Sequence, residues 1–166
     1  MDPNLASEED AKAFADIEKY GCHVLHIVEE ADLPPFAYSI GIQQSCGAPE
    51  LVVIGLKQPL AHFVINEYNK QVRTGARFRA GGYYSGFLES FDCKMQGVHR
   101  SHYKDYFGWG LWLYKGSEFE VLQLVYPTVE GIWPWDAEAT EWFRNRQPLL
   151  ETPKDHQSNG RNRIPQ

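Results

Sequence analysis

The sequence predicts an α+β fold in which a mixed or largely antiparallel sheet is covered by two or three helices within a single domain. The chain has 166 residues, the usual size of one domain, which can bury roughly two-thirds of its unfolded surface. Segments with helical periodicity stand before, between and after the strand segments, without regular strand–helix alternation. Aromatic residues make up 14% of the chain, which indicates a bulky, ordered interior. We expect one globular domain over residues 1–152 and a disordered polar tail over residues 153–166.

Two longer helices are predicted in the first half of the chain. Ser7 can cap the first, and acidic residues fill its first turn, where the helix dipole favours negative charge. This helix is expected over residues 8–19, and Gly21 ends it. The second begins near Pro59, which suits a first helical turn, and its apolar residues recur at helical spacing until Gly75.

Runs of β-branched and apolar residues predict the strands. They lie over residues 22–28, 36–42 and 50–56, around Phe78, and over residues 87–95, 109–114 and 119–126. The run ELVVIGL at 50–56 is apolar throughout, so we expect a central strand that is covered on both faces. The last two segments flank a short polar turn and predict a β-hairpin. Short helices are expected over residues 102–107 and 137–144, the second capped by Asp136.

The formal net charge of −6 is divided unevenly along the chain. Residues 153–166 carry +2, because Lys154, Arg161 and Arg163 outnumber Asp155, so the rest of the chain carries −8. A body this acidic repels phosphate backbones and attracts basic groups. We therefore expect a protein partner with basic character and no nucleic-acid partner.

The three cysteines, Cys22, Cys46 and Cys93, are odd in number and show no CxxC spacing, which favours a reducing compartment. With no signal-peptide pattern and no run of ~20 apolar residues, we expect a cytoplasmic protein with no membrane association. Cys22 and Cys93 lie in apolar strand contexts and should be buried, whereas Cys46 lies in a loop and should be exposed. Ser39, in YSIGI, lacks the GxSxG elbow of a nucleophilic serine.

The most conspicuous stretch is the aromatic segment VLQLVYPTVEGIWPWD, in which two X-Pro bonds stiffen a loop after a strand. Trp133 and Trp135, two residues apart, would face opposite sides of an extended segment. Two interpretations stay open. Either both indoles lie in the core and Asp136 caps a helix, or the loop presents a binding surface that includes Gln123 and Tyr126.

Glu50 stands between Pro49 and the apolar run LVVI, at the mouth of a strand that we expect to be buried. A buried carboxylate needs a donor, for which the candidates are Arg77, Arg79, His62 and Tyr38. A structural ion pair is one interpretation. The other is a site carboxylate that shares a pocket with Tyr38 and His62.

Metal and cofactor motifs are absent from the sequence. His99 and His102 lie three residues apart, with Asp105 three further on, but no HExxH or CxxC spacing accompanies them. We expect solvated surface histidines and no metal site. Arg79-Ala80-Gly81-Gly82 matches neither a phosphate-binding loop nor a dinucleotide fingerprint, so no cofactor is predicted.

Four blocks of the chain, taken together and in this order, resemble the bacterial domain-of-unknown-function family 4262. They are YSIGI at residues 38–42, the stretch from Pro49 to Leu56, QLVYP at residues 123–127 and GIWPWD at residues 131–136. The resemblance covers residues 16–150 and implies a small cytoplasmic protein of bacterial or phage origin, with no established activity. Thr128 stands where the family more often has an aspartate, which removes a carboxylate that metal or acid–base chemistry would use.

Two functions are compatible with these residues. The first is a non-enzymatic binding protein, in the manner of immunity proteins that neutralise toxins, which the small size, net acidity and many aromatic residues favour. The second is a small hydrolase-like enzyme with a pocket around Tyr38, Glu50, His62 and the Gln123–Asp136 loop. We expect the first, and the sequence leaves open whether the protein catalyses any reaction.

Overall fold

The computed structural model describes residues 7–154. Of the tail predicted over residues 153–166, all but the first two positions lie outside the described residues. The helices are α1 (Glu8–Tyr20), α2 (Ile42–Cys46), α3 (Gln58–Arg73), α4 (Tyr103–Tyr106), α5 (Gly108–Tyr114) and α6 (Glu141–Arg146), with a 3₁₀ turn over Arg100–His102. The strands are β1 (His23–Ile27), β2 (Phe36–Ile40), β3 (Glu50–Ile54), β4 (Tyr83–Leu88), β5 (Phe91–Gly97) and β6 (Val121–Val125).

The strands form one mixed sheet in the order β1-β2-β3-β6-β5-β4. Neighbouring strands are antiparallel except β3 and β6, which run parallel with Glu50 opposite Val121 and Val52 opposite Gln123. Every residue of these two central strands is buried. The sheet confirms the predicted α+β class and the central place of the apolar run after Glu50.

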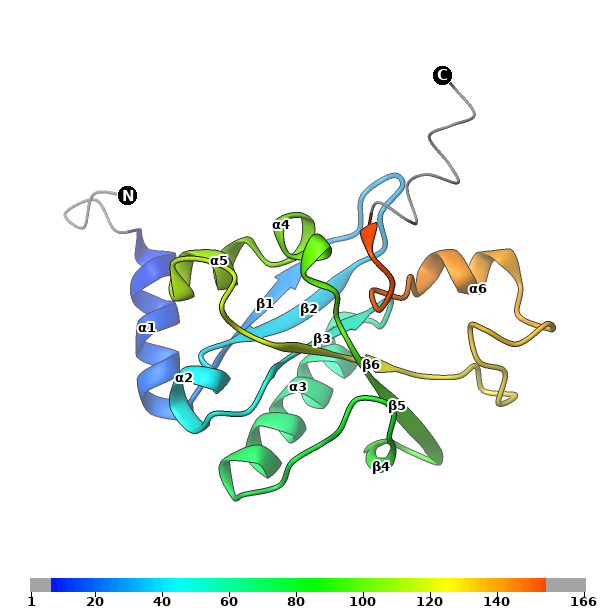
Figure 1. The fold of residues 1–166 in the computed structure, drawn as a ribbon, viewed down its shortest axis with the longest axis horizontal. Coiled ribbons are helices and arrows are strands. Elements are labelled where there is room, and N and C mark those ends of the chain that lie inside the picture. The colour runs from blue at the N-terminus through cyan, green and yellow to red at the C-terminus, as the bar shows by residue number, and fades with distance from the viewer. Residues whose placement is uncertain (1–6, 155–166) are drawn as a thin grey trace.

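Helices cover both faces of the sheet (Figure 1). On one face, α3 buries Val64 and Tyr68 in a core cluster that includes Leu51 of β3. On the other, α1 and the short α4 and α5 segments bring Ile17 and Phe107 into a second cluster. Because each buried side chain of this size contributes about 1.5–3 kcal/mol, burial on both faces stabilises the sheet strongly. No helix among residues 7–154 is long and apolar enough to cross a membrane.

The helix α1 begins at the predicted residue and ends one residue later than predicted, at Tyr20 before Gly21. The Ser7 hydroxyl accepts a hydrogen bond from the Asp10 backbone N–H, and the Asp10 carboxylate accepts one from the Ser7 N–H. This reciprocal capping box satisfies two N–H groups that a helix start otherwise leaves unpaired. At the other end, the Gly21 N–H donates to the Ile17 carbonyl.

The hairpin predicted from residues 109–114 and 119–126 is wrong, because the first of these segments is the helix α5. A short apolar run does not distinguish a strand from a buried helix by its period. Tertiary contacts decide the outcome: the Trp109 N–H donates to the Tyr38 hydroxyl at 3.0 Å. The second segment is a strand, as predicted, but it pairs with β3 and β5.

Two further segments differ from the prediction. Phe78 lies in a loop, and its ring contacts Tyr68, Tyr84 and Phe87 in the core. An aromatic residue that packs inward from a loop resembles a strand residue in sequence, which explains the strand predicted around it. The strand predicted over residues 87–95 is also wrong in part, because residues 89 and 90 form the turn between β4 and β5. The loop expected around Cys46 contains the short helix α2, and the N–H of its first residue, Ile42, donates to the buried Glu50 carboxylate.

Candidate functional site

Glu50 is a buried carboxylate at the amino end of β3, with 1% of its surface exposed. Its oxygens accept hydrogen bonds from the backbone N–H groups of residues 41–43 at 3.1 and 3.2 Å, from the Ser39 hydroxyl at 2.8 Å, and from the Tyr114 hydroxyl. Burial raises the pKa of the Glu50 carboxyl, while the hydrogen bonds from Tyr114, the backbone and Ser39 favour the charged form and oppose that rise. The carboxylate thus joins β2, α2 and the end of α5.

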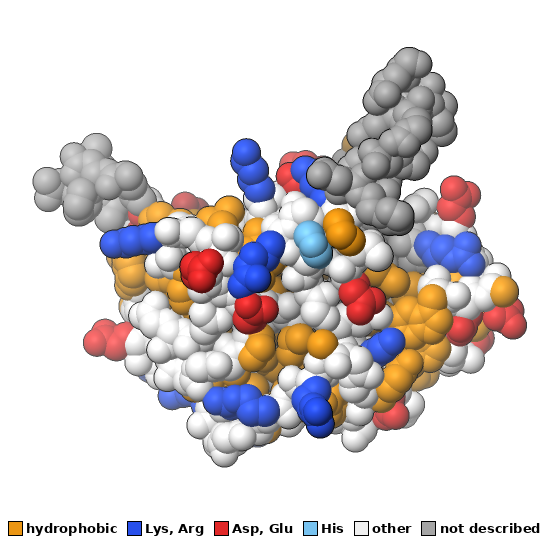
Figure 2. Space-filling model, in the orientation of Figure 1, with side chains coloured by type: hydrophobic (Ala, Val, Ile, Leu, Met, Phe, Trp, Pro, Cys, Tyr) orange, Lys and Arg blue, Asp and Glu red, His pale blue; other side chains and the backbone are white. Residues whose placement is uncertain are grey.

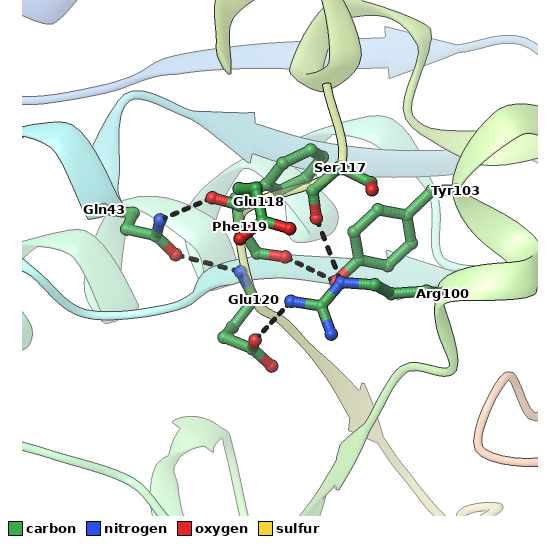
Figure 3. Close-up of polar contacts among 7 residues, drawn as sticks. All are labelled: Gln43, Arg100, Tyr103, Ser117, Glu118, Phe119 and Glu120. Carbon is green, nitrogen blue, oxygen red and sulfur yellow. Dashed lines mark hydrogen bonds and ion pairs between the residues drawn. The ribbon is translucent and has the colours of Figure 1, made fainter. Parts of the chain in front are cut away.

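The segment that leads from α5 into β6 runs beside Glu50, whose N–H donates to the Glu120 carbonyl at 2.9 Å. Polar side chains hold this segment in place (Figure 3). The Gln43 side chain donates to the Glu118 carbonyl at 3.2 Å and accepts from the Glu120 N–H at 2.9 Å. From the other side, Arg100 donates to the Glu120 carboxylate at 2.6 Å. Two more hydrogen bonds hold this segment: Arg100 Nε to the Ser117 carbonyl (3.0 Å) and Tyr103 Oη to the Phe119 carbonyl (2.7 Å). These polar side chains fix the backbone around the carboxylate.

Tyr38, Glu50 and His62 do not form the pocket that the hydrolase alternative requires. Tyr38 is buried on the face of the sheet that α5 covers, where its hydroxyl accepts from the Trp109 N–H. His62 is exposed on α3, which covers the opposite face, and it contacts His26. The sheet itself separates the two side chains, so the prediction of a shared pocket is wrong.

The donors predicted for Glu50 are also wrong. The sequence suggested Tyr38, His62, Arg77 or Arg79, whereas the hydrogen bonds come from backbone N–H groups and two hydroxyls. The physical reason is that α2 directs the unpaired N–H groups of its first turn at the carboxylate. Arg77 instead donates to the carbonyl of Cys46 at 2.7 Å.

Gln123 and Tyr126, the other two strand residues expected at a binding surface, are buried and bind the chain's own backbone. The fully buried Gln123 amide donates to the Pro148 carbonyl at 2.8 Å and accepts from the Leu150 N–H at 2.9 Å. The Tyr126 hydroxyl donates to the Ile54 carbonyl at 2.6 Å. Both side chains hold neighbouring segments against the central strands.

Trp133 and Trp135 face the same way, which corrects the prediction that they face opposite sides. The segment is not extended: the Asp136 N–H donates to the Trp133 carbonyl at 3.0 Å and closes a turn with Pro134 as its second residue. The turn stacks the two indoles with centroids 5.1 Å apart and 9° between the ring planes. Asp136 does not cap a helix, since its carboxylate accepts from the Trp133 N–H at 2.8 Å and Thr140 caps α6.

The stacked indoles continue onto the β4–β5 end of the sheet. The Trp133 ring meets Tyr83 edge to face at 5.5 Å, and the Lys94 ammonium lies 5.6 Å from the Tyr83 centroid and 4.9 Å from that of Trp135. Tyr83 is 52% exposed and Trp135 is 41% exposed. We call Tyr83, Lys94, Trp133 and Trp135 the aromatic platform. Figure 2 shows hydrophobic side chains gathered on the side of the molecule where the loop after β6 runs.

The loop that carries the two indoles of the platform is held in place from both ends. Arg144 of α6 donates to the carbonyls of Pro134 and Asp136, at 3.2 and 2.8 Å. At the start of the loop, the Thr128 hydroxyl accepts from the Ile132 N–H at 3.1 Å. Side chains on a backbone that is already ordered lose little conformational entropy when they bind. The platform is therefore suited to recognition.

A cavity of about 770 Å³ lies at the start of β2, between the loop after β1, α4 and α6. Its charged groups include Glu29, which pairs with Arg146 at 3.2 Å, and Asp105, which pairs with Lys154 at 2.7 Å. None of the eight residues proposed from the sequence is among the described residues that line it. The cavity therefore does not correspond to the predicted site.

His102 lines this cavity and is 3% exposed, so the expectation of a solvated surface histidine is wrong for it. Its Nε2 lies 2.7 Å from the Thr152 carbonyl and donates to it, and burial lowers the pKa of the His102 imidazole. His99 is exposed, and its Nδ1 accepts from the Ser101 N–H at 3.1 Å. Among the described residues, no group of three or more His, Cys, Asp or Glu side chains could hold a metal ion.

Lowering the pH is expected to destabilise the protein through His102. Because burial lowers the pKa of His102 in the folded state, the unfolded chain takes up a proton first, near the ordinary value of about 6.5. This contribution to stability is complete above that value, and it is lost as the pH falls from about 6.5 through the lower pKa of the folded state. Urea unfolding measured between about pH 7.5 and pH 5 would follow the loss.

The variant His102→Gln is the control for this pH dependence. Glutamine keeps a donor for the Thr152 carbonyl but does not titrate, so its stability should fall less than that of the wild type over the same range. His26, whose pKa burial also lowers, contributes to both proteins and cancels in the comparison. Equal slopes in the two proteins would contradict the role of His102.

The cysteines are free thiols. Cys22 and Cys93 are buried, as predicted, and burial raises the pKa of each to about 12. Cys46 is partly buried, whereas the sequence suggested exposure. Because the thiolate is the reactive form, Cys22 and Cys93 are inert at neutral pH.

Tyr83 and Lys94 belong to the platform, although the sequence did not single them out. They stand opposite each other in the register of β4 and β5. A strand predicted over residues 83–88 would place Tyr83 opposite Lys94. The strand is instead predicted around Phe78, because aromatic residues are frequent in strands. The correct start of β4 at Tyr83 is therefore the signal that could have identified these two residues.

The chain is similar to a protein family but to no individual known protein. No curated protein and no solved structure matches the chain. The family model that matches is a domain of unknown function, DUF4262, and it matches residues 16–140. That range includes β3, β6, Glu50 and the aromatic platform. The chain belongs to the DUF4262 family.

Proposed function

We propose that this protein is a non-enzymatic binding protein that recognises a protein partner through the aromatic platform. The observation that carries the proposal is the pair of stacked indoles, Trp133 and Trp135, held by a fixed loop beside Lys94 and the exposed Tyr83. Tryptophan and tyrosine are enriched at interface hot spots because each buries a large area with few rotatable bonds. An ordered aromatic surface of this kind supports recognition without any catalytic group.

The proposed partner is basic, and the proposed setting is the cytoplasm. The net charge of −6 attracts a basic protein at long range, while the platform supplies the contacts at short range. An immunity-type role, in which the partner is a toxin that this protein neutralises, is the specific form of the proposal. The free cysteines suit a reducing compartment. The hydrolase alternative is not proposed, because its pocket is not formed.

The variant Trp135→Ala is expected to weaken partner binding by about 2 kcal/mol, which is about 30-fold in Kd. The indole stacks on Trp133 and carries the Lys94 ammonium over its face, so truncation removes both contacts from the platform. The partner would first be captured from an extract of the source cell on the immobilised chain. Its affinity for each variant would then be measured with the purified pair by isothermal titration calorimetry.

Trp142→Ala is the matched control, because Trp142 is a tryptophan on α6 that is 69% exposed and lies outside the platform. It should bind the partner as the wild type does. A partner that binds Trp135→Ala and wild type equally would contradict the platform. For the immunity-type form, the protein encoded by the adjacent gene would be tested directly, and a neighbour that is neither bound nor inhibited would exclude it.

A further inference from the structure

Two imidazoles meet at the surface between β1 and α3. Nε2 of His26 lies 2.9 Å from Nδ1 of His62, while the ring centroids are 5.1 Å apart and the planes differ by 24°. Because the nitrogens are much closer than the centroids, the nitrogen-bearing edges face each other and the rings do not lie face over face. His62 is exposed and His26 is partly buried, so solvent reaches the pair.

The fold creates this meeting from residues that are distant in the sequence. Along the edge strand β1, alternation turns His26 toward α3, whereas His23 turns toward α1 and lies 2.7 Å from the Asp16 carboxylate. His62 stands in the second turn of α3, which packs across that end of the sheet. Both backbones are regular, so the positions of the two imidazoles are set by secondary structure.

We propose that His26 and His62 form a binding site for a divalent transition-metal ion such as Zn²⁺, Ni²⁺ or Cu²⁺. Imidazole nitrogen suits these ions, whereas Mg²⁺ and Ca²⁺ prefer oxygen. Zn–N bonds of about 2.0–2.1 Å at a tetrahedral angle place two ligand nitrogens about 3.3 Å apart. The two nitrogens now point at each other, so the exposed His62 side chain must rotate until both lone pairs converge on the ion and the nitrogens move from 2.9 Å to about 3.3 Å apart.

Metal binding at this pair needs no loss of protons from neutral rings. In the metal-free pair one ring donates its N–H to the other, so only one lone pair faces the gap. When the donor ring adopts its other tautomer, its proton moves to the outer nitrogen and both lone pairs face the ion. Protonation of either ring removes a ligand, so the ion is released at acid pH.

The site leaves coordination positions open. Within the part of the chain that the structure describes, no third His, Cys, Asp or Glu joins these two to make a larger metal-binding group. Water or an external ligand therefore completes the coordination of the ion. A site with two protein ligands and open positions binds exchangeably, in contrast to a closed structural zinc site.

Calorimetric titration of the full chain with Zn²⁺, near neutral pH, tests the proposal. The expected result is saturable one-to-one binding that Mg²⁺ does not reproduce. The variants His26→Asn and His62→Asn should each weaken binding about tenfold or more, since even the loss of an outer-shell partner costs about 10–100-fold. His99→Asn is the matched control, because His99 is also exposed but its imidazole bonds to Ser101 within its own turn.

Electron paramagnetic resonance of the Cu²⁺-loaded chain shows whether each histidine binds the ion directly or whether its variant weakens binding only by disturbing the fold. Hyperfine couplings from two imidazole nitrogens are expected in the wild type, and from one in each single variant. Trp135→Ala should leave metal binding unchanged, so this proposal and the platform proposal fail independently. Unchanged affinity in both histidine variants, or no saturable binding of any of the three ions, would show that the pair is only a hydrogen bond.

Discussion

Replacing Glu50 by glutamine is expected to lower the free energy of unfolding by about 3 kcal/mol or more. The carboxylate is buried and accepts five hydrogen bonds, including three from the backbone of residues 41–43 and one from Tyr114. Glutamine keeps one acceptor oxygen, but its NH₂ group would face donors that bind the carboxylate in the wild type. Urea unfolding followed by tryptophan fluorescence measures the loss.

Glu120→Gln is the control for this experiment. Glu120 also accepts a short hydrogen bond from a cationic partner, Arg100, but its side chain is 66% exposed. A solvated ion pair contributes about 1 kcal/mol or less, so this variant should be close to the wild type. If Glu50→Gln were no less stable than Glu120→Gln, the buried carboxylate would not be the joint between β2, α2 and α5 that its contacts indicate.

Replacing Gly55 by alanine is also expected to lower the free energy of unfolding by about 3 kcal/mol or more. Gly55 follows β3 with φ of +92°, where any Cβ is strained, and a Cβ there would stand 2.5 Å from the Arg146 carbonyl and 2.6 Å from the Tyr126 hydroxyl. The first of these atoms is backbone, and the second is bonded to the Ile54 carbonyl. Relief of the clash requires α6 to move away from the sheet, which urea unfolding would detect.

Gly47→Ala is the control that distinguishes the steric clash at Gly55 from the strain of a left-handed backbone. Gly47 has a similar φ of +80°, but a Cβ there would meet nothing within 4 Å. It should therefore cost only the left-handed penalty of about 1–2 kcal/mol. Equal losses in the two variants would mean that α6 is not packed tightly on Gly55.

The elements that the sequence predicts best are those with a local physical cause. The Ser7 cap with the acidic first turn sets the start of α1, and the apolar run after Glu50 predicts a strand buried on both faces. The helical spacing after Pro59 likewise predicts α3. Each of these signals lies within a few neighbouring residues, so no knowledge of distant contacts is needed to interpret it.

The elements that the sequence misplaces depend on distant contacts. The apolar run of residues 108–114 suits either a strand or a helix, and the hydrogen bond from Trp109 to Tyr38 and the packing on β2 accompany the helix. Phe78 has the composition of a strand residue but packs inward from a loop. In both cases the local preference is weak, and tertiary packing overrides it.

For the candidate site, too, some features follow from the sequence and others only from the tertiary structure. From the sequence alone, the chain is a single acidic α+β domain of an uncharacterised family, with a buried carboxylate at Glu50 and a stiff aromatic loop after a central strand. Only the tertiary structure decides that Glu50 binds the first turn of α2, that the turn at Pro134 stacks both indoles on one side, and that His26 meets His62. Composition and spacing determine which groups the chain carries, but the backbone path between distant segments determines which of them meet.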